Sequence, residues 1–83
     1  MNRKALYQRL LSGAVNNIDI DDIIDLANGF GFVLKRTRGS HNVLECSNIP
    51  EIINLQHQNG QAKPYQIKQL LKLIKAYNLK LRE

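Results

Sequence analysis

Eighty-three residues are enough for one domain with a small hydrophobic core and leave no room for a second core. Lysine and arginine number 12 against 7 aspartate and glutamate residues, for a net charge of +5. This excess favours a polyanionic partner. Nucleic acid is preferred over a membrane surface, because no segment combines a basic helical face with exposed large aromatic side chains.

The chain has a single cysteine, Cys46, so it cannot form an internal disulfide or a thiolate zinc site, and we expect Cys46 to be a small buried residue. No apolar run is long enough to span a bilayer, and the N-terminus lacks the apolar region of a signal peptide. We therefore expect a cytoplasmic protein with no membrane partner and no cofactor.

The first predicted element is a short helix that Asn2 can cap and that ends near Gly13. We assign residues 1–17 to an N-terminal helical arm and residues 18–83 to the main domain. One face of the arm is predicted to carry its apolar residues, which are Ala5, Leu6, Leu10 and Leu11.

The second predicted helix begins at Asp19 and ends at Asn28-Gly29. Asp21 and Asp22 fall in its first turn, where the helix dipole favours negative charge. This capping role accounts for the carboxylates, and their spacing lacks the oxygen-rich loop of a cation site, so we predict no metal. The apolar stripe of the helix is Ile20, Ile23, Ile24 and Ala27.

Three strands are predicted next. The first follows Phe30-Gly31 and alternates, with Phe32 and Leu34 on one face and Val33 and Lys35 on the other. Residues 39–40 read as a hairpin turn, a second strand covers residues 41–46, and a third covers residues 52–56. Residues 59–60 mark the exit loop.

The last predicted helix starts at Pro64, whose missing N–H costs nothing in a first turn. Its buried face is expected to hold Ile67, Leu70, Leu71 and Ile74. Without the arm, the element order is helix, three strands, helix. The fold class is therefore α+β, an αβββα sandwich in which a three-stranded antiparallel sheet packs against two helices, with an extra N-terminal helix.

The candidate site is the turn where a strand rich in cations meets a histidine. Lys35, Arg36 and Arg38 precede the turn, and His41 follows it. Cleavage of RNA by its own 2′-hydroxyl needs a base, an acid, and cations for the charge on the phosphorane. His41 can serve as base or as acid, and the arginines offer bidentate forks that a lysine lacks.

The turn itself contributes Gly39 and Ser40. Gly39 lets the backbone turn and approach a ligand closely, and Ser40 can orient the imidazole or donate to a phosphate oxygen. The alternative is that His41 is only a solvated polar residue at a hairpin edge.

His57 is a second titratable candidate, but strand parity argues against a catalytic pair. Leu44 in the second strand and Leu55 in the third should face the helices. His41 then lies on the open face and His57 on the inner face, so we treat His57 as a loop residue unless a bulge reverses the third strand.

Lys68, Lys72 and Lys75 share one flank of the last helix. This lysine flank is either a solvated surface or a track for RNA phosphates, and the sequence leaves both readings open. Tyr65 could stack on a base, but at the start of a helix beside Pro64 we expect it to pack instead.

Several of these segments together resemble the HicA family of bacterial toxins: Gly31-Phe32, the basic run into Gly39-Ser40-His41, residues 62–71, and Asn78-Leu79. The resemblance covers roughly residues 18–79. It implies a double-stranded-RNA-binding-like αβββα fold and a metal-independent ribonuclease, or mRNA interferase, that acts on messenger RNA. It also implies a HicB antitoxin that covers the active site, and it places the family's catalytic histidine at His41.

The expected phosphate-binding residues are Lys35, Arg36, Arg38, Gly39, Ser40, Lys63, Lys68 and Lys72. An inhibitor with carboxylates facing the arginines would suit the site. The alternative functions are a non-catalytic RNA-binding module that uses the same surface and a pure protein-interaction domain.

Overall fold

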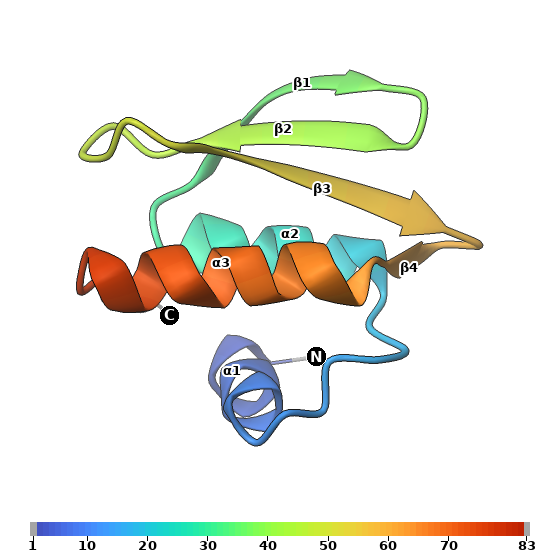
Figure 1. Ribbon diagram of the computed structural model, residues 1–83, viewed down its shortest axis with the longest axis horizontal. Coiled ribbons are helices and arrows are strands. Elements are labelled where there is room, and N and C mark those ends of the chain that lie inside the picture. The colour runs from blue at the N-terminus through green and yellow to red at the C-terminus, as the bar shows by residue number, and fades with distance from the viewer. Residues whose placement is uncertain (1, 83) are drawn as a thin grey trace.

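The computed structural model describes residues 2–82, in which three helices and four strands form three layers (Figure 1). The sheet lies on one side, α2 and α3 cover one of its faces, and α1 lies on the far side of these two helices. The helices are α1 (Arg3–Leu11), α2 (Ile20–Gly29) and α3 (Pro64–Ala76). The strands are β1 (Val33–Arg38), β2 (His41–Glu45), β3 (Ile52–Gln58) and β4 (Gln61–Ala62).

The sheet is antiparallel with strand order β1-β2-β3-β4, which confirms the predicted α+β sandwich. The structure adds a fourth strand to the predicted three. Residues 59–60, expected to form an exit loop, are the turn between β3 and β4. Asn59 adopts a positive φ of 55° and Gly60 one of 79°, as a tight strand connection requires.

Local capping fixes where the helices begin. The side chain of Asn2 accepts a hydrogen bond from the backbone N–H of Ala5 at 2.9 Å, and that of Asp19 accepts one from Asp21 at 2.8 Å. Pro64 is the first residue of α3, as predicted.

The core lies between the sheet and the helices. Ile23, Leu26, Leu44, Leu55, Ile67 and Leu70 are fully buried there, and Cys46 is buried as expected. The burial of residues on one face of β2 and β3 fixes the register of these two strands.

The N-terminal helix contributes to the same core. Leu6 and Leu10 are buried, and the ring of Tyr7 lies edge-on to Phe30 with centroids 4.9 Å apart. The predicted apolar face is wrong in part, because Ala5 is exposed and Leu11 is 61% exposed. The division of the chain into residues 1–17 and 18–83 stays a prediction.

The chain ends meet at the end of α2. Arg82 donates its backbone N–H to the carbonyl of Gly29 at 2.7 Å, and Arg3 donates to the carbonyl of Arg82 at 2.9 Å. Arg3 also forms a two-point ion pair with Asp25, at 2.9 and 3.2 Å. The hydrogen bond from Arg3 lowers the pKa of Asp25 and raises that of Arg3.

β1 is an edge strand, and all six of its residues are exposed. Phe32 and Leu34, which the predicted alternation placed on one face, differ in burial: Leu34 is 41% exposed, whereas Phe32, just before the strand, is 1% exposed. The physical reason is visible in Figure 1, where β1 lies at the sheet edge farthest from the helices. No helix in the described part of the chain is long and apolar enough to cross a membrane.

Candidate RNA-binding and proton-transfer site

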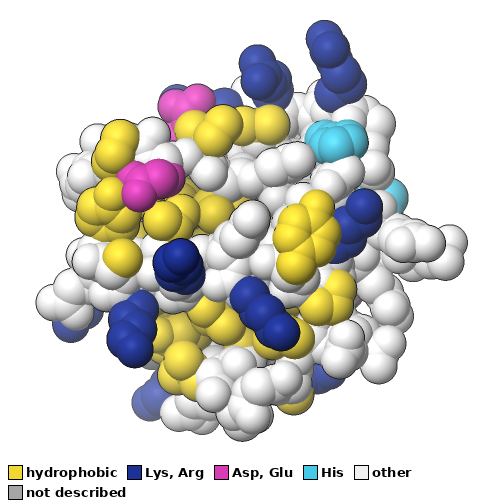
Figure 2. All heavy atoms as spheres, viewed as in Figure 1, with side chains coloured by type: hydrophobic (Ala, Val, Ile, Leu, Met, Phe, Trp, Pro, Cys, Tyr) yellow, Lys and Arg dark blue, Asp and Glu magenta, His cyan; other side chains and the backbone are white. Residues whose placement is uncertain are grey.

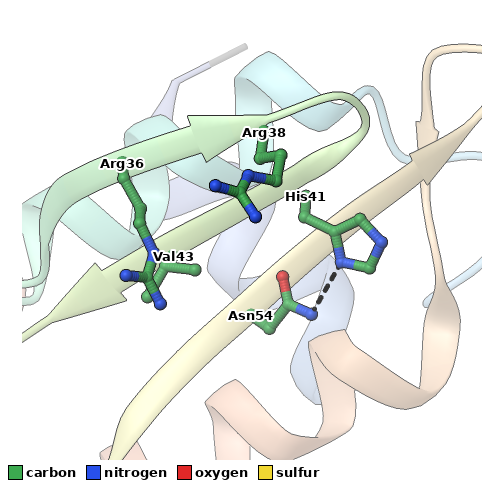
Figure 3. Close-up of a pocket in the computed structure, with 5 residues that line it drawn as sticks. All are labelled: Arg36, Arg38, His41, Val43 and Asn54. Atoms are coloured by element: carbon green, nitrogen blue, oxygen red, sulfur yellow. Dashed lines mark hydrogen bonds between the residues drawn. The ribbon is translucent and has the colours of Figure 1, made fainter.

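A pocket of about 380 Å³ opens on the face of the sheet that the helices leave uncovered. Its lining residues come from three neighbouring strands and are Arg36, Arg38, His41, Val43 and Asn54 (Figure 3). The pocket therefore brings together two of the three predicted strand cations and the predicted histidine. It presents two guanidinium groups and one imidazole to a ligand.

A β-bulge in β1 places the arginines beside His41. Leu34 pairs with Leu44, but Arg36 pairs with Val43, so Lys35 is the extra residue. Without a bulge, Arg36 would share the face of Leu34, because side chains two residues apart point the same way. With the bulge, Arg36 and Arg38 lie on the open face, the same face as their cross-strand partners Val43 and His41.

Both ring nitrogens of His41 contact side-chain amides on β3. Nδ1 lies 3.1 Å from Nδ2 of Asn54, and Nε2 lies 2.8 Å from Nε2 of Gln56. Figure 3 shows the Nδ1 edge of the ring turned toward Asn54 and the arginines, with Nε2 on the opposite edge. The exposed imidazole is thus held on one side of the pocket, facing the two cations.

The first turn of α3 holds the side chain of Gln56 in place by hydrogen bonds. Gln66, which is 3% exposed, accepts the backbone N–H of Gln56 at 2.6 Å and donates to the side-chain oxygen of Gln56 at 2.8 Å. Gln66 also donates to the hydroxyl of Tyr65 at 3.2 Å. Tyr65 itself is 55% exposed, so the expectation that it packs is wrong.

The turn between β1 and β2 contains Gly39 and Ser40, as predicted. Gly39 has a φ of +58°, and Ser40 is half-buried, with its carbonyl accepting the N–H of His57 at 3.3 Å. Neither residue lines the pocket. Lys35 is exposed at the bulge and does not line it either.

The other predicted cations lie away from the pocket. Lys63 is the N-cap residue of α3 and lines a different hollow, beside residues 58–62. Lys68 and Lys72 are exposed on α3, where Lys72 lines a third hollow with Glu51. Figure 2 shows Lys and Arg side chains both beside the exposed histidine and over the helix layer, with Asp and Glu side chains also on this side of the molecule.

The register confirms that the two histidines point to opposite faces of the sheet. His41 pairs with Gln56, so these two side chains share the open face, and the next residue, His57, points the other way. His57 lies within β3, so its assignment as a loop residue is wrong. It is half-buried, its Nδ1 has no hydrogen-bond partner among residues 2–82, and it does not line the pocket.

Sequence reasoning missed three polar residues of the site: Asn54, Gln56 and Gln66. The first two could have been found, because they alternate with the inward-facing Ile53 and Leu55 and so must share the open face with His41. No sequence pattern indicates Gln66, which occupies a buried position on an otherwise apolar helix face. Residues 2–82 contain no cluster of three His, Cys, Asp or Glu side chains that could hold a metal ion.

In a comparison with known protein families, the model of the HicA toxin of bacterial toxin-antitoxin systems matches residues 20–76. The chain belongs to the HicA toxin family. The match extends from the start of α2 to the end of α3, so it includes the whole sheet and every residue of the candidate site. No curated protein and no solved structure matches the chain.

Proposed function

We propose that this HicA-family protein is an mRNA interferase, a metal-independent endoribonuclease that cuts single-stranded messenger RNA in the cytoplasm. The observation that carries the proposal is the shared pocket of His41, Arg36 and Arg38. Family membership supports a toxin that acts on RNA within a toxin-antitoxin pair.

In the proposed reaction, the 2′-hydroxyl of the RNA attacks the adjacent phosphorus and the 5′-oxygen leaves. His41 transfers one of the two protons, either from the 2′-hydroxyl as general base or to the leaving 5′-oxygen as general acid, and water exchanges the other. Arg36 and Arg38 bind the non-bridging phosphate oxygens with their planar forks and stabilise the negative charge of the phosphorane. The product carries a 2′,3′-cyclic phosphate.

The rest of the basic surface binds the flanking RNA. Lys35 and the turn residues Gly39 and Ser40 lie next to the pocket along the chain. Lys63, Lys68 and Lys72 are proposed to contact phosphates farther along the strand. Tyr65, more than half exposed and hydrogen-bonded to Gln56, can stack on a base beside His41.

The decisive experiment is cleavage of a labelled single-stranded RNA in EDTA by the wild type and by His41→Ala. We expect cutting by the wild type, products ending in a 2′,3′-cyclic phosphate, and at least a 100-fold loss in the variant with RNA binding retained. If both proteins bind the RNA equally and neither cuts it, the proposed enzyme activity is refuted, and a non-catalytic RNA-binding module remains as the function. Absence of RNA binding by both proteins would leave the protein-interaction domain.

The partner that we propose is a HicB-like antitoxin that covers this pocket with carboxylates facing Arg36 and Arg38. Replacing both arginines by glutamate should weaken such a complex at least 10-fold, because each attraction becomes a repulsion. Lys4→Glu with Arg9→Glu on α1 is the matched control. Equal weakening by the two pairs would show that net charge alone drives binding.

A further inference from the structure

A chain of hydrogen bonds links the buried start of α3 to the ring of His41. It runs from Gln66 through Gln56 to Nε2 of His41, with each donor-acceptor distance at or below 2.8 Å. The chain has a direction, because every amide has one end that donates and one that accepts.

The backbone sets this direction. The N–H of Gln56 can only donate, so the atom of Gln66 that faces it must be the side-chain oxygen. The NH₂ group of Gln66 then donates to the side-chain oxygen of Gln56, which also receives the hydroxyl of Tyr65 at 3.4 Å. The NH₂ group of Gln56 is thereby turned toward His41, so Nε2 must accept.

A neutral imidazole that accepts at one nitrogen carries its proton on the other. The proton of His41 is therefore on Nδ1, which faces Asn54. The NH₂ group of Asn54 and the Nδ1–H group are both donors, so the end of the Asn54 amide that faces the ring must be its oxygen. A half-turn of this amide, which interchanges two nearly identical ends, gives Nδ1–H its acceptor.

From this geometry we infer that Gln66 is a positioning residue that fixes the neutral ring of His41 in the Nδ1–H form through Gln56. The ring edge that faces the arginines then carries the N–H, which donates to Asn54 in the protein without RNA. The lone pair that can take a proton lies at Nε2, beside Gln56. The relevance of this tautomer to RNA cleavage rests on the proposed function, but the tautomer itself does not.

Two isosteric substitutions should reverse the donors and acceptors in this chain of hydrogen bonds. In Gln66→Glu the carboxylate still accepts from the backbone of Gln56 but cannot donate, so the Gln56 amide turns and presents its oxygen to Nε2. In Gln56→Glu the carboxylate accepts both from Gln66 and from the ring. Either change should move the proton of His41 to Nε2. Gln69→Glu, an exposed change of the same charge on α3, is the matched control.

The test is a long-range ¹H–¹⁵N correlation spectrum of the imidazole rings at a pH where they are neutral, with His41→Ala used to assign the signals. Wild type and Gln69→Glu should show the unprotonated type of nitrogen at Nε2 of His41. Gln56→Glu and Gln66→Glu should show it at Nδ1.

An Nε2–H ring in the wild type, or an unchanged ring in a folded Gln56→Glu protein, would overturn the inference. Gln56 is half-buried, so Gln56→Glu decides the question if a carboxylate at the buried position 66 prevents folding. The spectrum needs no RNA. If the wild type does not cut RNA, the proposed function is refuted, but the spectrum still shows which nitrogen of His41 carries the proton.

Discussion

The arginine pair in the pocket makes a quantitative prediction about RNA binding. Each contact with a phosphate of a single strand changes the slope of log affinity against log salt by about 0.7, because counterions are released. Two such contacts, from Arg36 and Arg38, contribute about 1.4 to the slope. Between about 50 and 200 mM salt this share alone weakens binding about sevenfold. Replacing both arginines by glutamine should remove it.

The assay is fluorescence anisotropy of a labelled single-stranded RNA, with all proteins carrying His41→Ala so that the RNA stays intact. Affinities are measured at several salt concentrations, and the slope is compared among variants. The control replaces Lys4 and Arg9 by glutamine, which lowers the net charge equally but on α1, the layer farthest from the sheet.

We expect the arginine variant to lose about 1.4 units of slope and the α1 control to lose almost none. Equal losses in the two variants would mean that RNA responds to overall charge. The assignment of the phosphate to the pocket would then be wrong. An unchanged slope in the arginine variant would also show that the pocket does not bind the phosphate.

Three further outcomes follow from the fold. Lys68→Gln with Lys72→Gln should lower the salt slope by about another 1.4 in the same assay, and no change would assign this flank to solvation. Leu6→Ala should cost about 2–5 kcal/mol in urea unfolding, against less than about 0.5 for the exposed Leu11→Ala; equal costs would place α1 outside the core. The lowered pKa of Asp25 contributes stability that is present above its ordinary value of 3.8 and lost as pH falls through the lower folded value. Asp25→Asn should therefore lower the free energy of unfolding at pH near 6, and this loss should shrink as the pH falls below 3.8; a loss that does not change with pH would contradict this.

Local signals explain which parts of the fold the sequence predicts well. Helix starts at Asn2, Asp19 and Pro64 depend on one or two neighbouring residues, and the structure confirms them. The opposite orientation of His41 and His57 follows from strand parity, because the buried partners Leu44 and Leu55 fix the register of β2 and β3.

The same reasoning fails for β1 because no burial fixes its register. The strand lies beyond the helices and is exposed on both faces, so its hydrophobic pattern cannot say which side chains share a side. The sequence placed Lys35 with the arginines as phosphate ligands, and whether it binds phosphate stays a prediction. The bulge at this residue brings Arg36 and Arg38 to the face of His41. A sequence pattern does not reveal such an extra residue in a strand whose residues are all exposed.

Gln66, the buried glutamine of α3, is a second feature of the site that the sequence does not predict. An apolar residue at position 66 would complete the buried face of the helix, and a glutamine there must have its amide satisfied. Gln66 achieves this by three hydrogen bonds, two of them to Gln56, the residue that contacts the ring of His41. The packed helix layer thus sets the orientation of a side chain on the opposite, exposed face of the sheet. This coupling lets a rigid core determine the state of an otherwise solvated histidine, without a carboxylate partner that would neutralise the basic pocket.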